Sequence, residues 1–278
     1  MKTPTGLPID MVATDLDGTF LATGGQPTAF NVRAVLRASQ LGVRVVFATG
    51  RPSRWLQPLD AVRSAHPYAI ASNGAVVVNL ETGAVVEAHP LPVDVTADVA
   101  AQVGARVPGA GFAVEYTGGG WGRTPAYPVR GDMVAQDVLS GGAADLLHRG
   151  TAVKLLIYGP GVPTEALVRL VAPLVGDRLE LTYSMVRPDG LLELCAPGVN
   201  KASALRHLMA QDGIEPARLA AFGDMPNDLP MLRLAGYGFA MANAHPSLLD
   251  QDFRIAGDHD DSGFAHALLA LLGEPAAS

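Results

Sequence analysis

Two aspartates, Asp15 and Asp17, follow a short apolar run that begins at Met11. Residues two apart on a strand point to the same side, and Gly18 lets the chain turn sharply directly after them. We therefore expect both carboxylates to leave the carboxyl end of a buried strand together, where open α/β sheets bind ligands. Adjacent carboxylates repel unless a cation or a shared proton compensates, so the pair indicates a site for Mg²⁺ and phosphate. An ordinary Asp-Gly turn is the alternative for this segment taken alone.

A second pair of aspartates follows another apolar run, residues 219–222, which ends in Gly223 and Asp224. Pro226 suits the first turn of a following helix, so Asp224 and Asp228, four residues apart, are expected to flank the helix start and point to one site. Mg²⁺ prefers oxygen ligands and keeps some of its waters for substrate phosphate, so the two aspartates indicate a metal site. Helix capping by Asp224, with Asp228 as a surface charge, explains the segment equally well.

Two further segments carry groups that suit an anion. Thr49, Gly50 and Arg51 follow the apolar run 43–48, and a hydroxyl, a backbone N–H and a guanidinium at a strand end form a phosphate cradle. The same residues are compatible with a helix start at Pro52. Lys201 is one of only three lysines in the chain. Because a lysine in the first turn of a helix opposes the helix dipole, we expect it to bind something anionic, the alternative being a solvated surface lysine.

The order of these four segments, Asp-x-Asp-Gly-Thr, Thr-Gly-Arg, Lys and Gly-Asp-x-x-Asn-Asp, resembles the haloacid dehalogenase superfamily of phosphohydrolases. The chain is most similar to the Cof-type subgroup, since it also carries Ser72-Asn73-Gly74-Ala75, Gly198-Val199-Asn200-Lys201 and Asp260-Asp261-Ser262-Gly263-Phe264. Ala202 is a small departure, because a glycine often follows the lysine. The resemblance implies an α/β fold: a Rossmann-like parallel-sheet core with helices on both faces, and an α+β cap inserted after the third core strand.

The resemblance also implies a role for each matching residue. Asp15 is the nucleophile that forms an aspartyl-phosphate, and Asp17 is the general acid and then the general base. Asp15, the backbone carbonyl of Asp17, and Asp224 hold Mg²⁺. The implied contacts to phosphate or substrate are Gly18, Thr49, Gly50, Arg51, Asn73, Lys201 and Asn227; of these Thr49 and Lys201 are also catalytic, and Asn227 touches either phosphate or a metal-bound water. Asp228 orients Lys201.

The pattern of elements predicts where the two domains divide. Strands and helices alternate through residue 72, which favours a parallel sheet: a helix capped by Thr28, a strand at 43–48, a short helix opened by Pro52, and a strand at 68–72. We predict a catalytic core of residues 1–83 and 190–278, with Leu191–Cys195 pairing back into it. Residues 84–189 are predicted to form the cap that selects the substrate. Within the cap, residues 118–122 are too rich in glycine for regular structure, and Trp121, Arg123 and Tyr127 are candidates to contact the leaving group, although packing explains Trp121 equally well.

Composition narrows the remaining possibilities. The chain has 278 residues, is 49% hydrophobic and carries a net charge of −7 with a pI near 5.4, which argues against a nucleic-acid partner bound by a basic face. No apolar stretch matches a signal peptide or reaches the ~18 residues of a membrane span, so we predict a cytoplasmic protein. Cys195 is the single cysteine and is expected in a quiet core position. The sequence leaves a monomer and a homodimer equally open.

The predicted function is a Mg²⁺-dependent phosphatase acting on a small phosphorylated metabolite, such as a sugar phosphate or a phosphorylated cofactor. The alternative is a phosphotransferase or sugar phosphomutase that uses the same aspartyl-phosphate. A receiver-type signalling module is disfavoured by Asp17 and by the inserted segment, and a catalytically silent binding protein by the complete set of acids, threonine and lysine. The acidic tract Asp258-His259-Asp260-Asp261 is predicted to cap the last helix rather than to bind metal.

Overall fold

The computed structural model describes residues 6–129 and 138–275, which divide into two compact units. The first unit comprises residues 1–86 and 201–278, and the second comprises residues 87–200. None of the helices in the described part of the chain combines the length and the apolar character needed to cross a membrane. Each unit has its own sheet and its own hydrophobic core.

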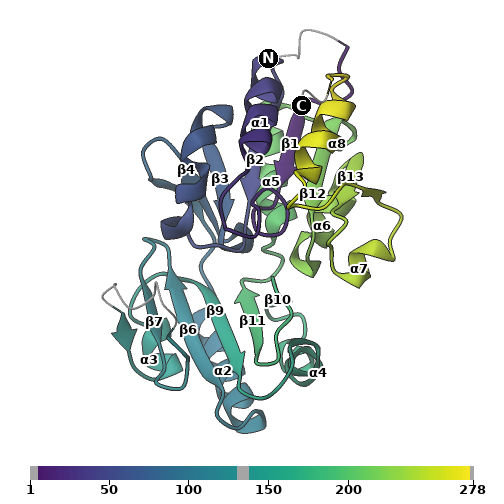
Figure 1. Cartoon of the computed structure of the whole chain (residues 1–278). Helices are drawn as coiled ribbons and strands as arrows, with labels where there is room; N and C mark the ends of the chain where they lie inside the picture. The colour runs from purple at the N-terminus through teal and green to yellow at the C-terminus, as the bar shows by residue number, and fades with distance from the viewer. Residues whose placement is uncertain (1–5, 130–137, 276–278) are drawn as a thin grey trace. The chain divides into compact units, whose positions relative to one another are not determined.

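The first unit is built on an eight-stranded sheet in the order β14-β13-β12-β1-β2-β3-β4-β5 (Figure 1). Its strands are β1 (Met11–Thr14), β2 (Arg44–Ala48), β3 (Tyr68–Ala71), β4 (Val76–Asn79), β5 (Val85–Ala88), β12 (Leu219–Gly223), β13 (Tyr237–Ala240) and β14 (Arg254–Ile255). All pairings from β14 to β3 are parallel, and β4 runs antiparallel to β3. The predicted parallel-sheet core is confirmed.

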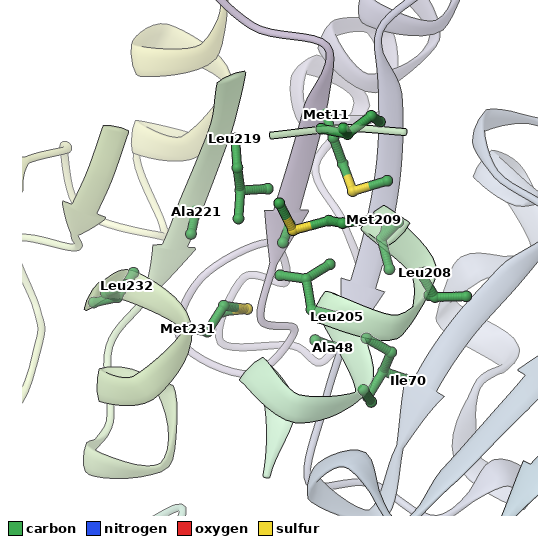
Figure 2. Packing of buried hydrophobic residues seen from close by; sticks show 14 of the residues in the cluster. Met11, Ala48, Ile70, Leu205, Leu208, Met209, Leu219, Ala221, Met231 and Leu232 are labelled. Atoms are coloured by element: carbon green, nitrogen blue, oxygen red, sulfur yellow. The ribbon is translucent and has the colours of Figure 1, made fainter. Parts of the chain in front are cut away.

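Alternate side chains of these strands form a core on one face of the sheet. Met11, Val46 and Leu219 lie on that face, where α5 (Lys201–Asp212) and α6 (Leu229–Leu234) cover them. Figure 2 shows Leu205 and Leu208 of α5 among these strand residues, with Met231 of α6 beside them. Because Lys201 is the first residue of α5, the packing of this helix fixes where the lysine enters the structure.

The other face of the sheet carries an aromatic core. Phe47 of β2 and Phe222 of β12 contact Phe20 and Phe264, with ring centroids 5.0 Å apart in the Phe20–Phe47 and Phe222–Phe264 pairs. The helices on this face, α1 (Ala29–Gln40) and α8 (Gly263–Leu271), pack against each other. Thr28 caps α1 as predicted, since its side chain accepts a hydrogen bond from the Asn31 N–H. Helices therefore cover both faces, as predicted.

The segment after Arg51 differs from its prediction. In place of one helix opened by Pro52, it forms two 3₁₀ helices, η1 (Ser53–Trp55) and η2 (Gln57–Ala65), which meet at Leu56. Pro58 lies in the first turn of η2 and has no N–H to donate, which favours a break in the α-helical hydrogen bonding before it. The short helix α7 (Pro246–Leu249) was not predicted.

The second unit is an α+β unit with a six-stranded sheet in the order β10-β11-β9-β6-β7-β8. Its strands are β6 (Gly111–Tyr116), β7 (Trp121–Arg123), β8 (Leu139–Ser140), β9 (Ala152–Gly159), β10 (Glu180–Thr182) and β11 (Gly190–Cys195). The helices α2 (Val93–Arg106), α3 (Ala143–Leu147) and α4 (Thr164–Val175) share one core with alternate strand residues such as Val114 and Leu155. The predicted class, an α/β core plus an α+β insertion, is confirmed.

Three local features of this region differ from the sequence interpretation. The strand β11, predicted to pair back into the core, lies instead between β9 and β10 and pairs antiparallel with both. The strand β5, predicted to belong to the insertion, joins the eight-stranded sheet beside β4. The compact units consequently divide at 86/87 and 200/201 rather than at 83/84 and 189/190. The segment Trp121–Arg123, expected to be irregular, forms the strand β7. Its glycines disfavour a strand, but hydrogen bonds to the neighbouring strand β6 stabilise it.

Candidate active site

Four neighbouring strands of the first unit end beside one another and deliver most of the predicted site residues. The strands β12, β1, β2 and β3 are neighbours in the sheet (Figure 1). Directly after their carboxyl ends come Asp224, Asp15, Thr49 and the Ser72–Gly74 turn, respectively. The register is level, since Thr14 lies opposite both Phe47 and Phe222. In an open parallel sheet this edge is the usual ligand-binding crevice.

The turn after β1 allows the two clusters of acids to approach each other. Gly18 has a φ of +76° and its backbone lies so close to Asp224 that an added Cβ would overlap the Asp224 carboxylate. Thr19 donates a hydrogen bond to Asp224 Oδ1 at 3.2 Å, and Asn243 Nδ2 donates one to the Gly18 carbonyl at 2.8 Å. Thr19 and Asn243 were not predicted as site residues, although Thr19 lies within the quoted motif. Nothing in the sequence links Asn243 to Gly18.

Lys201 is fully buried and lies between two carboxylates. Its Nζ donates to Asp15 Oδ1 at 2.5 Å and to Asp228 Oδ1 at 2.6 Å. Burial by itself lowers the pKa of a lysine, but the attraction of Asp15 and Asp228 outweighs it, so the pKa of Lys201 is raised and the ammonium stays charged. The lysine is thus a permanent cation that touches the proposed nucleophile.

Asp228 is occupied by structural contacts. Its Oδ2 accepts hydrogen bonds from the N–H groups of Asp224 and Met225, each at 3.0 Å, while Oδ1 accepts from Lys201. Its side chain therefore fixes the turn that carries Asp224 and orients the lysine. The contact between Asp228 and Lys201 expected from the sequence is present.

The buried acids carry more negative charge than Lys201 neutralises. Asp15, Asp224 and Asp228, each ionised, together with one ammonium group give a formal charge of −2. Burial raises the pKa of Asp15 to about 7, and burial together with the negative charges of Asp15 and Asp228 raises the pKa of Asp224 to about 9. The pocket therefore favours either protons or an added cation.

The donor set fits a hard divalent cation. One carboxylate oxygen from each of Asp15, Asp224 and Asp228 lies within 4.8 Å of the others, and oxygen ligands are those that Mg²⁺ prefers. Because Asp228 is held by Lys201 and the backbone, Asp15 and Asp224 are the carboxylates left for an ion. The Oδ1 atom of Asn227 is buried without a hydrogen-bond partner in the described part of the chain, so a further acceptor lies on the segment between Asp224 and Asp228.

Arg51 contacts Asp17. Its Nε and Nη2 donate to the two carboxylate oxygens of Asp17 at 2.7 and 2.6 Å, which is a bidentate pair. The Asp17 side chain is 57% exposed, whereas Asp15 is buried. Asp15 therefore lies in the buried cluster. Asp17 is more exposed and is held by Arg51, which is predicted to contact substrate.

The loop after β2 is joined to the turn after β3. Thr49 is buried, its Oγ1 accepts from the Arg51 N–H at 3.0 Å, and its carbonyl accepts from the Asn73 N–H at 2.9 Å. Asn73 Oδ1 accepts from Asn227 Nδ2 at 3.1 Å. The structure therefore connects Thr49, Arg51, Asn73 and Asn227, which come from three separate segments of the sequence.

The other candidates from the sequence lie elsewhere. Asp258, His259 and Asp260 are clustered, but Asp260 accepts hydrogen bonds from Thr23. The first N–H of α8 is accepted by the Asp258 carbonyl, so the predicted capping involves the backbone rather than the acidic side chains. Trp121 and Tyr127 are buried in one apolar cluster of the second unit, which favours the packing interpretation. Cys195 is buried, as predicted.

Comparison with known proteins identifies the family. The model of the haloacid dehalogenase-like hydrolases matches residues 12–268. A Serratia proteamaculans protein named HMP-PP phosphatase is 31% identical over 281 residues, covering 95% of this chain and 96% of its own length. The Bacillus subtilis protein YxeH is 30% identical over 274 residues, covering 94% of this chain and 98% of its own. The chain belongs to the haloacid dehalogenase-like hydrolase family.

The fold agrees with that assignment. The solved structure of the sugar phosphatase BT4131, of subclass IIB of the superfamily, superposes with a TM-score of 0.77 at 20% identity, covering 95% of this chain and 99% of its own. The predictions of the family, of its Cof-type subgroup and of the enzyme class, a phosphoric monoester hydrolase, are confirmed by the family model and the two named relatives.

Proposed function

We propose that the protein is a Mg²⁺-dependent phosphatase that hydrolyses a small phosphorylated metabolite through an aspartyl-phosphate on Asp15. The observation that carries the proposal is the contact of a fully buried Lys201 with Asp15, in a cluster that also holds Asp224. Lys201 donates its hydrogen bond to Oδ1 of Asp15, so the other carboxylate oxygen, Oδ2, is the one proposed to face phosphorus. That oxygen is the proposed nucleophile.

The reaction requires two displacements at phosphorus. In the first, Asp15 Oδ2 forms a bond to phosphorus, the bond to the leaving-group oxygen breaks, and protonated Asp17 gives its proton to that oxygen. In the second, a water attacks phosphorus, Asp17 takes its proton, and the bond to Asp15 breaks. Inorganic phosphate leaves, and both aspartates return to their starting states.

Asp17 has to change partners for this role. Both of its carboxylate oxygens accept hydrogen bonds from Arg51, so Asp17 has to give up at least one of these bonds to carry a proton to the leaving group. An incoming phosphate is itself a bidentate acceptor for a guanidinium. Contact of Arg51 with substrate therefore stays a prediction, in which phosphate takes the place of Asp17 on the arginine.

The remaining groups bind charge. Asp15, Asp224 and the backbone carbonyl of Asp17 are the proposed ligands of Mg²⁺, which when bound neutralises their repulsion and clamps a phosphoryl oxygen. Thr49, the backbone at Gly18 and Gly50, and Lys201 are proposed to donate hydrogen bonds to the other phosphoryl oxygens, where negative charge persists during the transfer.

We propose that the second unit, residues 87–200, is the cap that selects the leaving group. The relatives support a small phosphorylated substrate, since one is named as an HMP-PP phosphatase and a structural neighbour as a sugar phosphatase. A sugar phosphate or a phosphorylated cofactor is the proposed class of substrate. A cytoplasmic location and the oligomeric state, monomer or homodimer, stay predictions.

The test is release of inorganic phosphate from a panel of phosphorylated metabolites, each assayed with Mg²⁺ and with EDTA. Asp15→Asn is expected to abolish turnover, because an amide does not attack phosphorus, and EDTA is expected to remove the activity until Mg²⁺ is restored. Retained turnover in Asp15→Asn contradicts the covalent step, and full activity in EDTA contradicts the metal. Transfer of the phosphoryl group to an alcohol rather than to water identifies a phosphotransferase.

A further inference from the structure

The turn that follows β3 has an unusual backbone. Ser72 and Asn73 are both buried, and both have positive φ values, 48° and 59°, followed by Gly74 at 100°. Left-handed backbone is unfavourable for residues with a side chain, although asparagine tolerates it better than most. Two successive buried residues in this conformation persist only where their surroundings hold them, and such strain concentrates at functional sites.

Hydrogen bonds fix this turn to the loop that carries Thr49. The Asn73 N–H donates to the Thr49 carbonyl and the Ser72 N–H donates to the Arg51 carbonyl, both at 2.9 Å. The turn therefore has one position relative to the proposed phosphate-binding loop. Its effect is to direct the side chain of Asn73 at a residue 154 positions away in the sequence.

That residue is Asn227, in the short 3₁₀ helix η6 (Pro226–Asp228) after Asp224. Asn227 Nδ2 donates to Asn73 Oδ1 at 3.1 Å, and both side chains are buried. An asparagine amide has a donor end and an acceptor end. Because the donor end faces Asn73, the acceptor end, Oδ1, points elsewhere, and it is buried without a hydrogen-bond partner in the described part of the chain.

The chemistry of an amide oxygen restricts what it can bind. It accepts hydrogen bonds, so it does not pair with the oxygens of a phosphate dianion, which are acceptors too. It needs a donor, and no group in the described part of the chain donates to it; the two hydrogen bonds of the Lys201 ammonium go to Asp15 and Asp228 instead. Mg²⁺ keeps several of its waters when it binds to carboxylates, and a water on an ion held by Asp224, three residues before Asn227, would be such a donor.

We propose that Asn73 is a positioning residue that holds Asn227 so that its Oδ1 accepts a hydrogen bond from a water of the bound divalent cation. The left-handed turn is the means by which Asn73 reaches Asn227. The inference rests on the metal site of the proposed function. It does not depend on which compound is hydrolysed, or on whether hydrolysis occurs.

The test is a double-mutant cycle read out by calorimetric titration of the metal-free full chain with Mg²⁺. Asn73→Gly removes the side chain and suits the positive φ, and Asn227→Ala removes the positioned amide. Each is expected to weaken Mg²⁺ binding about three- to tenfold, the effect of one lost hydrogen bond. The double variant is expected to bind as Asn227→Ala does, because Asn73 then has nothing to position.

Control variants separate positioning from strain. Ser72→Gly relaxes the neighbouring left-handed residue and keeps both amides, so its Mg²⁺ affinity is expected to equal that of the wild type. Asn73→Asp keeps an acceptor oxygen for Asn227 Nδ2 and is expected to restore binding lost in Asn73→Gly. If Asn73→Gly does not fold, Asn73→Ser carries the same prediction, since its hydroxyl is one bond shorter than the amide.

Three results would overturn the proposal. One is Mg²⁺ affinity unchanged in Asn73→Gly, and another is independent losses that multiply in the double variant. The third is an effect confined to binding of inorganic phosphate, which would mean that the Asn227 amide is oriented the other way and donates to substrate. A wild type that binds Mg²⁺ but releases no phosphate from any compound contradicts the proposed function and leaves this cycle intact, whereas a wild type that binds no Mg²⁺ overturns both.

Discussion

Replacing Lys201 by methionine tests the electrostatic balance of the proposed site. The substitution keeps most of the volume of a side chain that is fully buried, and it removes contacts of 2.5 and 2.6 Å to Asp15 and Asp228. With all three carboxylates ionised, the formal charge of the cluster of Lys201, Asp15, Asp224 and Asp228 changes from −2 to −3. Removing one partner of a buried ion pair costs about 3–5 kcal/mol, because the other partner stays buried without compensation.

The assay is urea unfolding of the metal-free protein in EDTA at pH 7.5 and at pH 5. At pH 7.5 the variant is expected to lose about 3–5 kcal/mol, equivalent to roughly 6–20 °C in melting temperature. At pH 5 the loss is expected to be smaller. Burial already raises the pKa of Asp15 to about 7, so removing the lysine leaves a carboxyl that is neutral at the lower pH.

The matched control is an ion pair of similar length on the surface. Arg178 lies 2.7 Å from Asp98, and the two side chains are 38% and 52% exposed. Arg178→Met is expected to leave the unfolding midpoint within experimental error at both pH values, since solvent screens such a pair. A loss below about 1 kcal/mol for Lys201→Met at pH 7.5, the range of surface pairs, would refute the argument that the lysine neutralises a buried excess of negative charge.

Two further predictions concern the same cluster. Because burial raises the pKa of Asp15 to about 7 and that of Asp224 to about 9, the folded metal-free protein binds more protons than the unfolded chain. Its stability should therefore fall as the pH rises from about 4 towards 9. The increase in melting temperature caused by Mg²⁺ should be larger at pH 8.5 than at pH 6, and an equal increase at both would contradict these pKa values. Gly18→Ala is expected to reduce Mg²⁺-induced stabilisation, because its Cβ would overlap the Asp224 carboxylate and its φ is +76°. The control is Gly24→Ala, whose Cβ meets nothing within 4 Å. An unchanged Mg²⁺ response in Gly18→Ala would show that the turn has room to adjust.

The strand ends of the core could be predicted because their signals are local. Each of the runs before Asp15, Thr49 and Asp224 is a short apolar segment that ends in a turn, and these three segments follow β1, β2 and β12 in the structure. Parallel strands align their carboxyl ends, so the pattern also predicts that the groups after them approach one another.

Predictions failed where the pairing of one strand with another decides the structure. The glycines around Trp121 disfavour a strand locally, yet β7 forms because β6 is beside it. The apolar sequence of β11 is compatible with either sheet. Its pairing with the antiparallel strands β9 and β10 decides to which sheet it belongs. The residues of β7 and β11 do not carry this information themselves, because their pairing partners lie on other strands, such as Glu115 for Trp121 and Leu155 for Leu194.

By itself, the sequence determined which chemistry is available: carboxylates after strands, a hydroxyl and N–H groups for phosphate, and a lysine in the first turn of a helix. Tertiary structure alone decided which group each side chain serves. Lys154 and Lys201 are both buried between two carboxylates, but Lys154 lies between Glu115 and Glu193 in the second unit, while Lys201 contacts Asp15. The tertiary structure also brings Arg51 to Asp17 and Asn73 to Asn227. Such contacts depend on how helices and strands pack, because a side chain forms hydrogen bonds with the groups that folding brings within about 3 Å. No local sequence pattern encodes which groups these are.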